Sequence, residues 1–294
     1  MPRLFKSKLR TALADVFALC AFLAAWACWL EPGSITVRRV ALPVPLWREE
    51  HRGLKVALLT DLHVGSPHVG LDKLRRVVAR ANEERPDLVL LLGDYVIGDR
   101  KEDGGVKAGV LGGEFVEPEP IAAELKNLRA PLGVYAVLGN HDWWYDGERV
   151  TRALEGAGIV VLENRAVRVE SGGRGLWLAG VADLWTRKPD IEGTLRQAAP
   201  DEPVLLFTHN PDIFPDVPPR VSLTLAGHTH GGQVNLPFIG RPVVPSHYGQ
   251  RYAFGHVVED GRHLFVSGGV GTSIVPVRFR VPPEIVVLTL KPEK

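Results

Sequence analysis

The segment from 225 to 233 reads Leu-Ala-Gly-His-Thr-His-Gly-Gly-Gln, which places His228 and His230 two positions apart. It continues an apolar run that starts at Val221, a pattern typical of a buried strand ending in a glycine-rich turn. Side chains at i and i+2 of a strand project to the same side, and imidazole is a common ligand for zinc-like ions. The pattern favours a metal-binding pair at a strand end; a purely structural role for the two histidines is the alternative.

Four other apolar runs are followed by polar residues in the same way. Each run reads as a strand, and the residues after it carry oxygen or nitrogen atoms that can bind a metal. These residues are Asp61 and His63 after 54–60, Asp94 after 88–92, Asn140, His141 and Asp142 after 133–138, and His209 after 204–208. Ligands of an open α/β sheet collect outside the carboxyl ends of its strands. The sequence therefore predicts one metal site shared by all five strand ends.

The elements that must position these residues follow from the apolar patterning. Helical spacing over 71–84 joins the strands at 54–60 and 88–92 into a βαβ unit, which predicts that these strands are parallel. Residues 98–117 are rich in glycine and charge and are expected to form an exposed loop that borders the site. Further strands are expected at 35–42, 159–162, 167–170, 176–181, 252–259, 264–266 and 285–290, and helices at 120–128, 148–155 and 191–198. This many strands favours two packed sheets with helices outside.

The series of motifs resembles the calcineurin-like metallophosphoesterases. The matching stretches, in the family's order and rough spacing, are Asp61-x-His63, Gly93-Asp94, Gly139-Asn140-His141-Asp142, His209 and Gly227-His228-x-His230. The resemblance implies an α/β fold, a four-layer αββα sandwich of two mixed β-sheets, and hydrolysis of phosphoester bonds. The stretches Gly231-Gly232-Gln233 and Pro276-Val277-Arg278 are similar to a bacterial branch of the family. That branch has membrane-anchored members and includes some pyrophosphatases acting on UDP-2,3-diacylglucosamine.

The resemblance also implies two divalent metal ions, Mn, Zn or Fe. On this mapping one ion takes Asp61, His63, Asp94 and His230, and the other takes Asp94, Asn140, His209 and His228. Mixed nitrogen and oxygen ligands without a thiolate suit these metals. Asp94 is therefore expected to be shared by the two ions.

Three residues that are not metal ligands are expected to take part in catalysis or substrate binding. His141 resembles the family histidine that stabilises or protonates the leaving oxygen. Asp142 is expected to orient His141 through a ring N–H, the alternative being that it only caps the following turn. Arg278 follows a glycine-rich segment, and its guanidinium could bind a substrate phosphate; a salt bridge is the alternative. The aromatic residues 143–145 and the apolar loop 236–245 could bind a nucleobase or an acyl chain, or could simply pack on the core.

Residues 1–32 differ from the rest of the chain. Basic residues precede an apolar run from Ala12 to Leu30, close to the roughly 20 residues that span a bilayer. Trp26 and Trp29, near the end of the run, are of the residue type enriched at membrane interfaces. The alternatives to a membrane-spanning helix are a cleaved signal peptide and a buried helix. We expect a single-pass membrane anchor followed by one catalytic domain over 33–294. A weak charge bias of the flanks favours an extracytoplasmic domain.

Composition narrows the function further. The formal net charge is +1, which argues against a nucleic-acid partner because such proteins carry a strongly basic surface. Both cysteines lie in the apolar segment, so the catalytic domain has no thiol nucleophile or thiolate ligand. We expect hydrolysis of a phosphodiester or pyrophosphate bond of a lipid or nucleotide-lipid. A nuclease, a general phosphomonoesterase and a non-catalytic binding module on the same scaffold are the alternatives.

Overall fold

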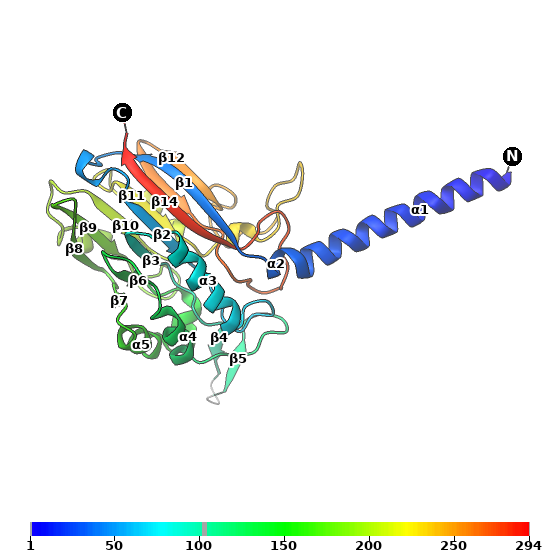
Figure 1. The fold of residues 1–294 in the computed structure, drawn as a ribbon, viewed down its shortest axis with the longest axis horizontal. Coiled ribbons are helices and arrows are strands. Elements are labelled where there is room, and N and C mark those ends of the chain that lie inside the picture. The colour runs from blue at the N-terminus through cyan, green and yellow to red at the C-terminus, as the bar shows by residue number, and fades with distance from the viewer. Residues whose placement is uncertain (1, 102–104, 294) are drawn as a thin grey trace.

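The computed structural model describes residues 2–101 and 105–293, and it contains two six-stranded β-sheets with helices outside them (Figure 1). The first sheet has the order β1-β14-β2-β3-β6-β7. The bounds of its strands are Thr36–Val44 (β1), Glu284–Pro292 (β14), Lys55–Leu59 (β2), Leu88–Leu91 (β3), Val134–Ala136 (β6) and Val160–Val161 (β7). All neighbours are parallel except β14 and β2, so the sheet is mixed.

The second sheet has the order β12-β13-β11-β10-β9-β8. The bounds are Gly255–Glu259 (β12), Arg262–Val266 (β13), Leu223–Ala226 (β11), Val204–Phe207 (β10), Arg174–Gly180 (β9) and Arg165–Ser171 (β8). Its three inner pairings are parallel and its two edge pairings are antiparallel, so this sheet is also mixed.

The period-2 alternation of strand side chains builds the four layers. On β2, Val56 and Leu58 point into a core between the two sheets, together with apolar residues of β10 and β11. Ala57 and Leu59 point the other way, into a core shared with helices α3 (Leu71–Glu83), α4 (Pro118–Leu125) and α5 (Asn140–Gly156). The outer face of the second sheet packs on α6 (Ile191–Leu195) and the 3₁₀ helix Pro211–Asp216. The four-layer αββα sandwich is confirmed.

One expectation about local structure was wrong in part, and another was incomplete. Residues 98–117 contain two short paired strands, β4 (Gly98–Arg100) and β5 (Val106–Ala108), where a loop was expected. The helix expected at 148–155 is the second part of α5, because Asp146 has non-helical backbone angles (φ −168°, ψ 83°) and divides α5 in two. The first part, which begins at Asn140, was not expected; there the Asp142 side chain accepts a hydrogen bond from the Gly139 amide and caps the helix start.

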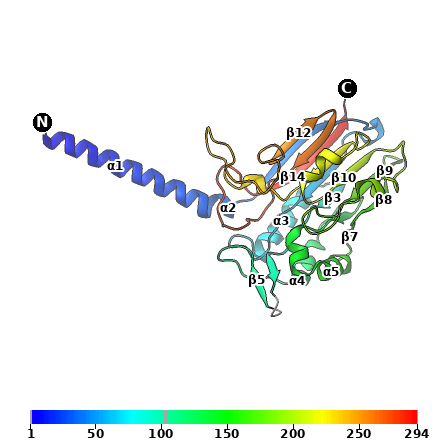
Figure 2. The same ribbon diagram turned by 180° about the vertical axis from the view of Figure 1, so that it is seen from behind.

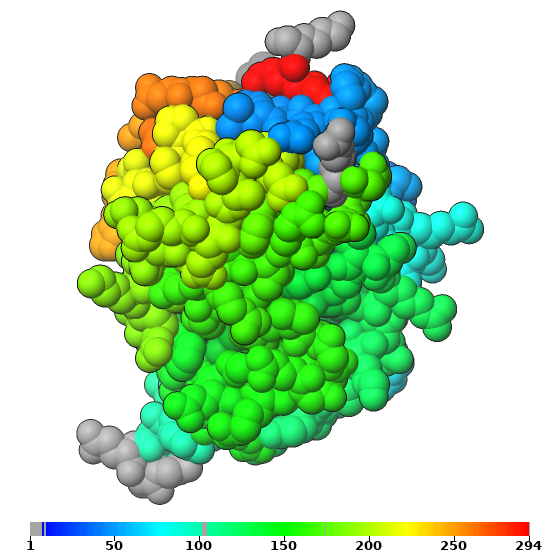
Figure 3. Space-filling view, turned by 90° about the vertical axis from the view of Figure 1, so that its left-hand side faces the viewer, coloured from blue at the N-terminus to red at the C-terminus, as the bar shows by residue number. Residues whose placement is uncertain are grey.

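The amino-terminal segment forms one long helix that projects away from the domain (Figures 1 and 2). Helix α1 (Pro2–Ala25) continues through a π-helical turn (Trp26–Leu30) into α2 (Glu31–Gly33). The stretch Arg10–Gly33 is long and apolar enough to cross a membrane. Seen from the side opposite to this helix, the domain presents a rounded surface (Figure 3).

Candidate active site

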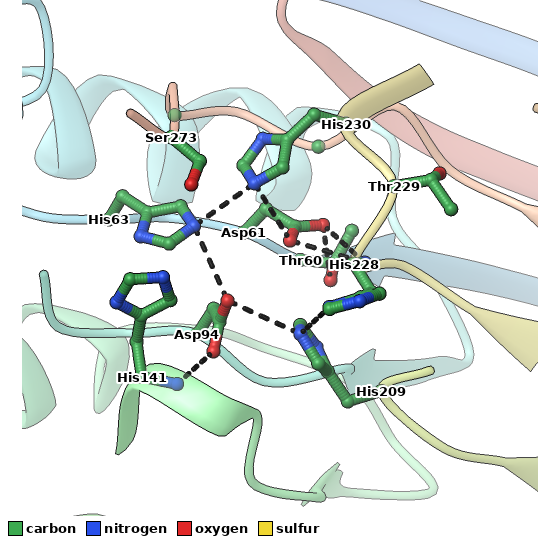
Figure 4. A network of polar contacts seen from close by, with 12 residues as sticks. Thr60, Asp61, His63, Asp94, His141, His209, His228, Thr229, His230 and Ser273 are labelled. Atoms are coloured by element: carbon green, nitrogen blue, oxygen red, sulfur yellow. Dashed lines mark hydrogen bonds and ion pairs between the residues drawn. The ribbon is translucent and has the colours of Figure 1, made fainter. Parts of the chain in front are cut away.

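The carboxyl ends of five strands meet at one edge of the sandwich, as predicted. Strands β2 and β3 of the first sheet end next to β10 and β11 of the second, so that both sheets contribute side chains (Figure 4). The structure brings together the predicted ligands, which are Asp61, His63, Asp94, Asn140, His209, His228 and His230, and each of them is buried.

Three of these residues surround a first position for a cation. The Nε2 atoms of His63 and His230 are 3.1 Å apart, and His230 Nε2 lies 3.4 Å from Asp61 Oδ1. His63 Nε2 also lies 3.4 Å from Oδ2 of Asp94. Ring nitrogens and carboxylate oxygens that converge in this way provide the mixed ligand set of a transition-metal ion.

A second position lies on the other side of Asp94. His209 Nε2 is 3.2 Å from Asp94 Oδ2 and 3.1 Å from Nδ1 of His228. The same Asp94 oxygen therefore faces both ligand groups, which is the arrangement expected of a carboxylate that bridges two ions. The other oxygen, Oδ1, accepts a hydrogen bond from the His141 amide at 2.9 Å.

The surroundings of the donor atoms fit divalent cations. Asn140 Oδ1 is buried and has no hydrogen-bond donor among the described residues, although a buried amide oxygen normally has one. His209 Nδ1 lies 2.7 Å from the carbonyl oxygen of Leu92, which fixes the ring and directs Nε2 toward Asp94. A second hydrogen bond of this kind is common for metal-binding histidines.

The protonation states of the histidines also fit metal binding. Burial lowers the pKa of His63 to about 3, and burial lowers the pKa of His228 and His230 well below their usual range. These rings are neutral and can offer a lone pair. Burial acts in the same direction on His209, but the carboxylates led by Asp94 outweigh it and raise the pKa of His209 to about 10. The raised pKa of His209 reflects its contact with the Asp94 carboxylate, whose Oδ2 lies 3.2 Å from Nε2.

Five ligand residues have left-handed backbone angles. The φ values are 51° at Asp61, 43° at His63, 57° at Asp94, 70° at His228 and 52° at His230. Residues other than glycine rarely adopt this region, and each instance costs roughly 1–3 kcal/mol. The interactions at the site must supply this energy, so these positions are ones where the ordinary backbone preference is overridden.

His141 lies beside this ligand set at the start of α5. Its ring contacts the rings of His63 and Trp144, with centroid distances of 4.9 and 4.8 Å, and its side chain lines the adjoining pocket. Its Nδ1 atom lies 3.7 Å from Oδ1 of Asp99. Asp99 was missed in the sequence because it lies in the segment expected to be a solvated loop, and only the β4–β5 hairpin brings it to His141.

Asp142 does not have the predicted role of orienting His141. Its two carboxylate oxygens accept hydrogen bonds from the backbone amides of Asp94, Tyr95, Val96 and Gly139 at 2.8–3.3 Å. Burial and the neighbouring Asp94 carboxylate raise the pKa of Asp142 to about 7, against the effect of these amides. Asp142 thus holds together the two loops that carry Asp94 and Asn140, which is closer to the capping alternative.

The prediction that Arg278 binds substrate is also corrected. The side chain is fully buried, and burial lowers its pKa to about 10. Its guanidinium donates hydrogen bonds to the backbone carbonyls of Gly268, Gly269, Gly271 and Val281. These donors are used inside the protein, so Arg278 shapes the loop beside Asp61 and does not reach a substrate phosphate.

A pocket of about 620 Å³ opens above the ligands. Its floor contains Asp94, Asn140, His141, His228 and His230, and its walls include Trp144, Trp185, Val243, Val244, Ile274 and Val275. Of the aromatic residues 143–145, only Trp144 lines this pocket, because Tyr145 is buried in the core and Trp143 packs against it. Trp185 packs edge-on against His228 at 4.3 Å and was missed, although it follows the strand at 176–181 as the other site residues follow theirs.

Comparisons with known proteins agree with this geometry. The family model described as calcineurin-like phosphoesterase matches residues 54–232. The chain is 32% identical over 271 residues to an uncharacterized metallophosphoesterase of Bacillus subtilis, YkuE, covering 90% of this chain and 89% of that protein. It is 33% identical over 272 residues to the phosphodiesterase YaeI of Escherichia coli, covering 89% and 90%. A Danio rerio protein described as a transmembrane protein with metallophosphoesterase domain is 30% identical over 86% of this chain and 56% of its own length.

Proposed function

Because the chain belongs to the calcineurin-like phosphoesterase family, whose members are metal-dependent phosphoester hydrolases, we propose that it cleaves a phosphodiester or pyrophosphate bond of a lipid or nucleotide-linked lipid. The observation that carries this proposal is the pocket, whose floor consists of metal ligands and whose walls are largely apolar. A phosphate group fits the floor, and an acyl chain or another apolar group fits the walls. The similarity to a protein named phosphodiesterase supports a diester over a monoester.

We assign roles to the residues as follows. Asp61, His63, Asp94 and His230 would hold one divalent cation, Mn, Zn or Fe, and Asp94, Asn140, His209 and His228 would hold the other. Two such cations, when bound, polarise a phosphoryl oxygen and make water acidic enough to attack phosphorus at neutral pH.

His141 is the residue we assign to the leaving oxygen. It lines the same pocket as the ligands, and it also lies close enough to His63 and Asp94 for the three side chains to hold a cation; the family resemblance is what assigns it to the substrate. Its Nδ1 atom lies 3.7 Å from Oδ1 of Asp99, and a ring N–H can donate a hydrogen bond or a proton to the leaving oxygen. Trp144 and Trp185 lie next to each other, with ring centroids 6.3 Å apart, and pack against His141 and His228 respectively.

The amino-terminal helix is proposed to be an uncleaved membrane anchor. Apolar side chains of α1, including Phe17 and Phe22, are exposed, which suits a lipid environment. The base of the helix is part of the domain: the Arg278 amide donates to the carbonyl of Ala27 at 3.0 Å, and the Val281 amide donates to Oε1 of the buried Glu31 at 2.6 Å. Cleavage near residue 27 would remove the Ala27 carbonyl from the Arg278 amide and leave Glu31 on the domain.

The side of the membrane is tied to the choice of substrate. The flanking charges favour an extracytoplasmic domain, whereas nucleotide-linked lipid precursors are handled on the cytoplasmic face. A topology reporter fused after Lys294 decides between them. If the reporter lies outside the cytoplasm, the protein is not a UDP-diacylglucosamine pyrophosphatase, and a lipid phosphodiester remains as the proposed substrate. If the reporter lies in the cytoplasm, the extracytoplasmic location of the catalytic domain is wrong.

The enzyme assay uses the full-length chain in detergent, stripped of metal with EDTA and reconstituted with manganese, zinc or iron. Substrates are bis-p-nitrophenyl phosphate, p-nitrophenyl phosphate, UDP-2,3-diacylglucosamine and a single-stranded DNA, with His141→Ala beside the wild type. We expect diester hydrolysis that disappears with EDTA, returns with metal, and falls by about 10²–10⁴-fold in His141→Ala. Preferred cleavage of DNA would favour the nuclease, and preferred cleavage of p-nitrophenyl phosphate would favour the monoesterase.

A further inference from the structure

Three loops around the mouth of the pocket carry exposed apolar side chains. We call the loops 110–113, 234–245 and 271–281 the apolar rim. Its members that are more than half exposed are Leu111, Phe238, Ile239, Val243 and Ile274, and Phe238 is completely exposed. Single exposed apolar residues are common, but five in the loops around one pocket form a patch of the kind that marks an interaction surface.

The rim is one continuous structure. The Leu111 amide donates to the carbonyl of Ile274 at 3.0 Å, which joins the first loop to the third. The Asn235 amide donates to the carbonyl of Phe279 at 2.9 Å, which joins the second loop to the third. Val243 and Ile274 also line the pocket above the metal ligands. The exposed patch therefore leads directly into the candidate active site.

The third loop of the rim also holds the base of the amino-terminal helix. It provides the amide of Arg278, which contacts Ala27, and the amide of Val281, which contacts Glu31. Figures 1 and 2 show loops of the domain beside α2, where the helix meets the sandwich. Lys73 adds a third contact through a hydrogen bond from Nζ to the carbonyl of Pro32 at 2.5 Å. These contacts fix the rim relative to the helix.

This attachment sets the depth of the rim in a membrane. Ala27 lies six residues before Gly33, the end of the apolar stretch Arg10–Gly33. At a rise of 1.5 Å per residue, the contact with Arg278 lies about 9 Å below that end. Trp26 and Trp29, which are of the residue type enriched at membrane interfaces, occupy the same turn of the helix. A span that ends at these two tryptophans brings the third loop to the boundary between headgroups and acyl chains.

We propose that the apolar rim is a membrane-docking surface, which inserts into the lipid leaflet at the base of the anchor so that the pocket receives its substrate from the bilayer. This inference rests on the proposed anchor, and it deepens the proposed function because it makes the substrate a lipid of that leaflet. The phosphate reaches the metal ligands while the apolar part of the lipid stays in contact with Val243 and Ile274. Interfacial binding through exposed apolar side chains has the same physical basis as binding by amphipathic helices.

The depth of the rim can be measured without any activity. The full-length chain, with Cys20→Ala and Cys28→Ala, receives one environment-sensitive fluorophore through Phe238→Cys or, as a control, Val258→Cys. Val258 is an exposed valine on the edge strand β12, outside the rim. The proteins are reconstituted in vesicles of phosphatidylethanolamine and phosphatidylglycerol (3:1) that contain a lipid with a quencher at carbon 5 of the acyl chain. Aqueous iodide is the competing quencher.

The proposal predicts opposite results at the two positions. The label at 238 is quenched at least about threefold more by the lipid than by iodide, since it lies in the leaflet, and the label at 258 shows the reverse. Quenching by iodide alone at 238 overturns the proposal. Protection of this label from both quenchers also overturns it, because a second copy of the chain or another protein would then cover the rim.

A functional experiment uses the double variant Phe238→Asp, Ile239→Asp, with Val258→Asp as the matched control. Charged side chains in the rim are expected to lower hydrolysis of a vesicle-borne lipid by at least tenfold and to leave hydrolysis of soluble bis-p-nitrophenyl phosphate unchanged. Equal activity of the double variant and the control on the vesicle-borne lipid contradicts docking. If the wild type cleaves the soluble diester but no lipid, the lipid substrate of the proposed function fails, while the quenching result still decides the docking surface.

Discussion

Asp142 offers the sharpest test of how the site is held together. One carboxylate oxygen accepts from the amides of Asp94 and Gly139, both at 2.8 Å, and the other accepts from Tyr95 at 2.9 Å and Val96 at 3.3 Å. The substitution Asp142→Asn keeps the size of the side chain but replaces one oxygen by an NH₂ group. Whichever way the new amide faces, one pair of backbone amides loses its acceptor and meets hydrogens instead.

The magnitude follows from these contacts. Above pH ~7, where the Asp142 carboxylate is charged, a hydrogen bond to it contributes about 1.5–3 kcal/mol, so two lost bonds correspond to about 3–6 kcal/mol. This is a large part of the roughly 5–15 kcal/mol by which domains are stable. We also expect weaker metal binding, because Asp94 and the helix that carries Asn140 are no longer tied together.

Urea denaturation measures the first effect, and calorimetric titration of the metal-free protein with manganese measures the second. The matched control is Asp99→Asn. Asp99 lies beside the His141 ring, is partly exposed, and has no comparable set of amide donors among the described residues. Its stability should change by less than about 0.5 kcal/mol. If Asp142→Asn has wild-type stability and metal affinity but a lower kcat, Asp142 does not hold the two loops together. The result would instead support the sequence-based prediction that Asp142 orients the His141 ring.

Three further predictions concern residues that support the ligands. Arg278→Met removes the donors to the loop carbonyls and should cost about 3 kcal/mol or more in urea denaturation; a raised KM at unchanged stability would instead restore its predicted contact with substrate. Gly227→Ala places a methyl group against the Thr60 hydroxyl and 2.7 Å from Asp61 Oδ2, so the affinity for manganese should fall at least about tenfold. The control is Gly156→Ala, whose methyl group meets nothing within 4 Å and which should bind manganese like the wild type. Burial raises the pKa of Glu163 from 4.5 to about 7, so folding takes up a proton between these values and stability falls as the pH rises through this window. Glu163→Gln should remove that slope, by up to about 3 kcal/mol between pH ~4.5 and ~7; equal slopes in the two proteins would contradict the assignment.

The sequence by itself determined the fold class and predicted the group of polar side chains that the structure brings together. The strands that carry Asp61, Asp94 and His209 are short apolar runs, and each ligand stands directly after its run. Both features are local, so they can be recognised without knowing which strands are neighbours. The motif order then indicated the family, and the family implied two packed sheets, which the structure confirms.

Only the tertiary structure decided the roles of the supporting residues. Asp142 is bonded to amides 46–48 positions away, and Arg278 is bonded to the loop beside Asp61. A polar side chain in the sequence shows what it can bond to, but the identity of its partner depends on which backbone groups the folded chain leaves nearby without a partner. The same limit applies to Asp99 at His141 and to the contact between Arg278 and Ala27, since each arises where segments distant in sequence are packed together.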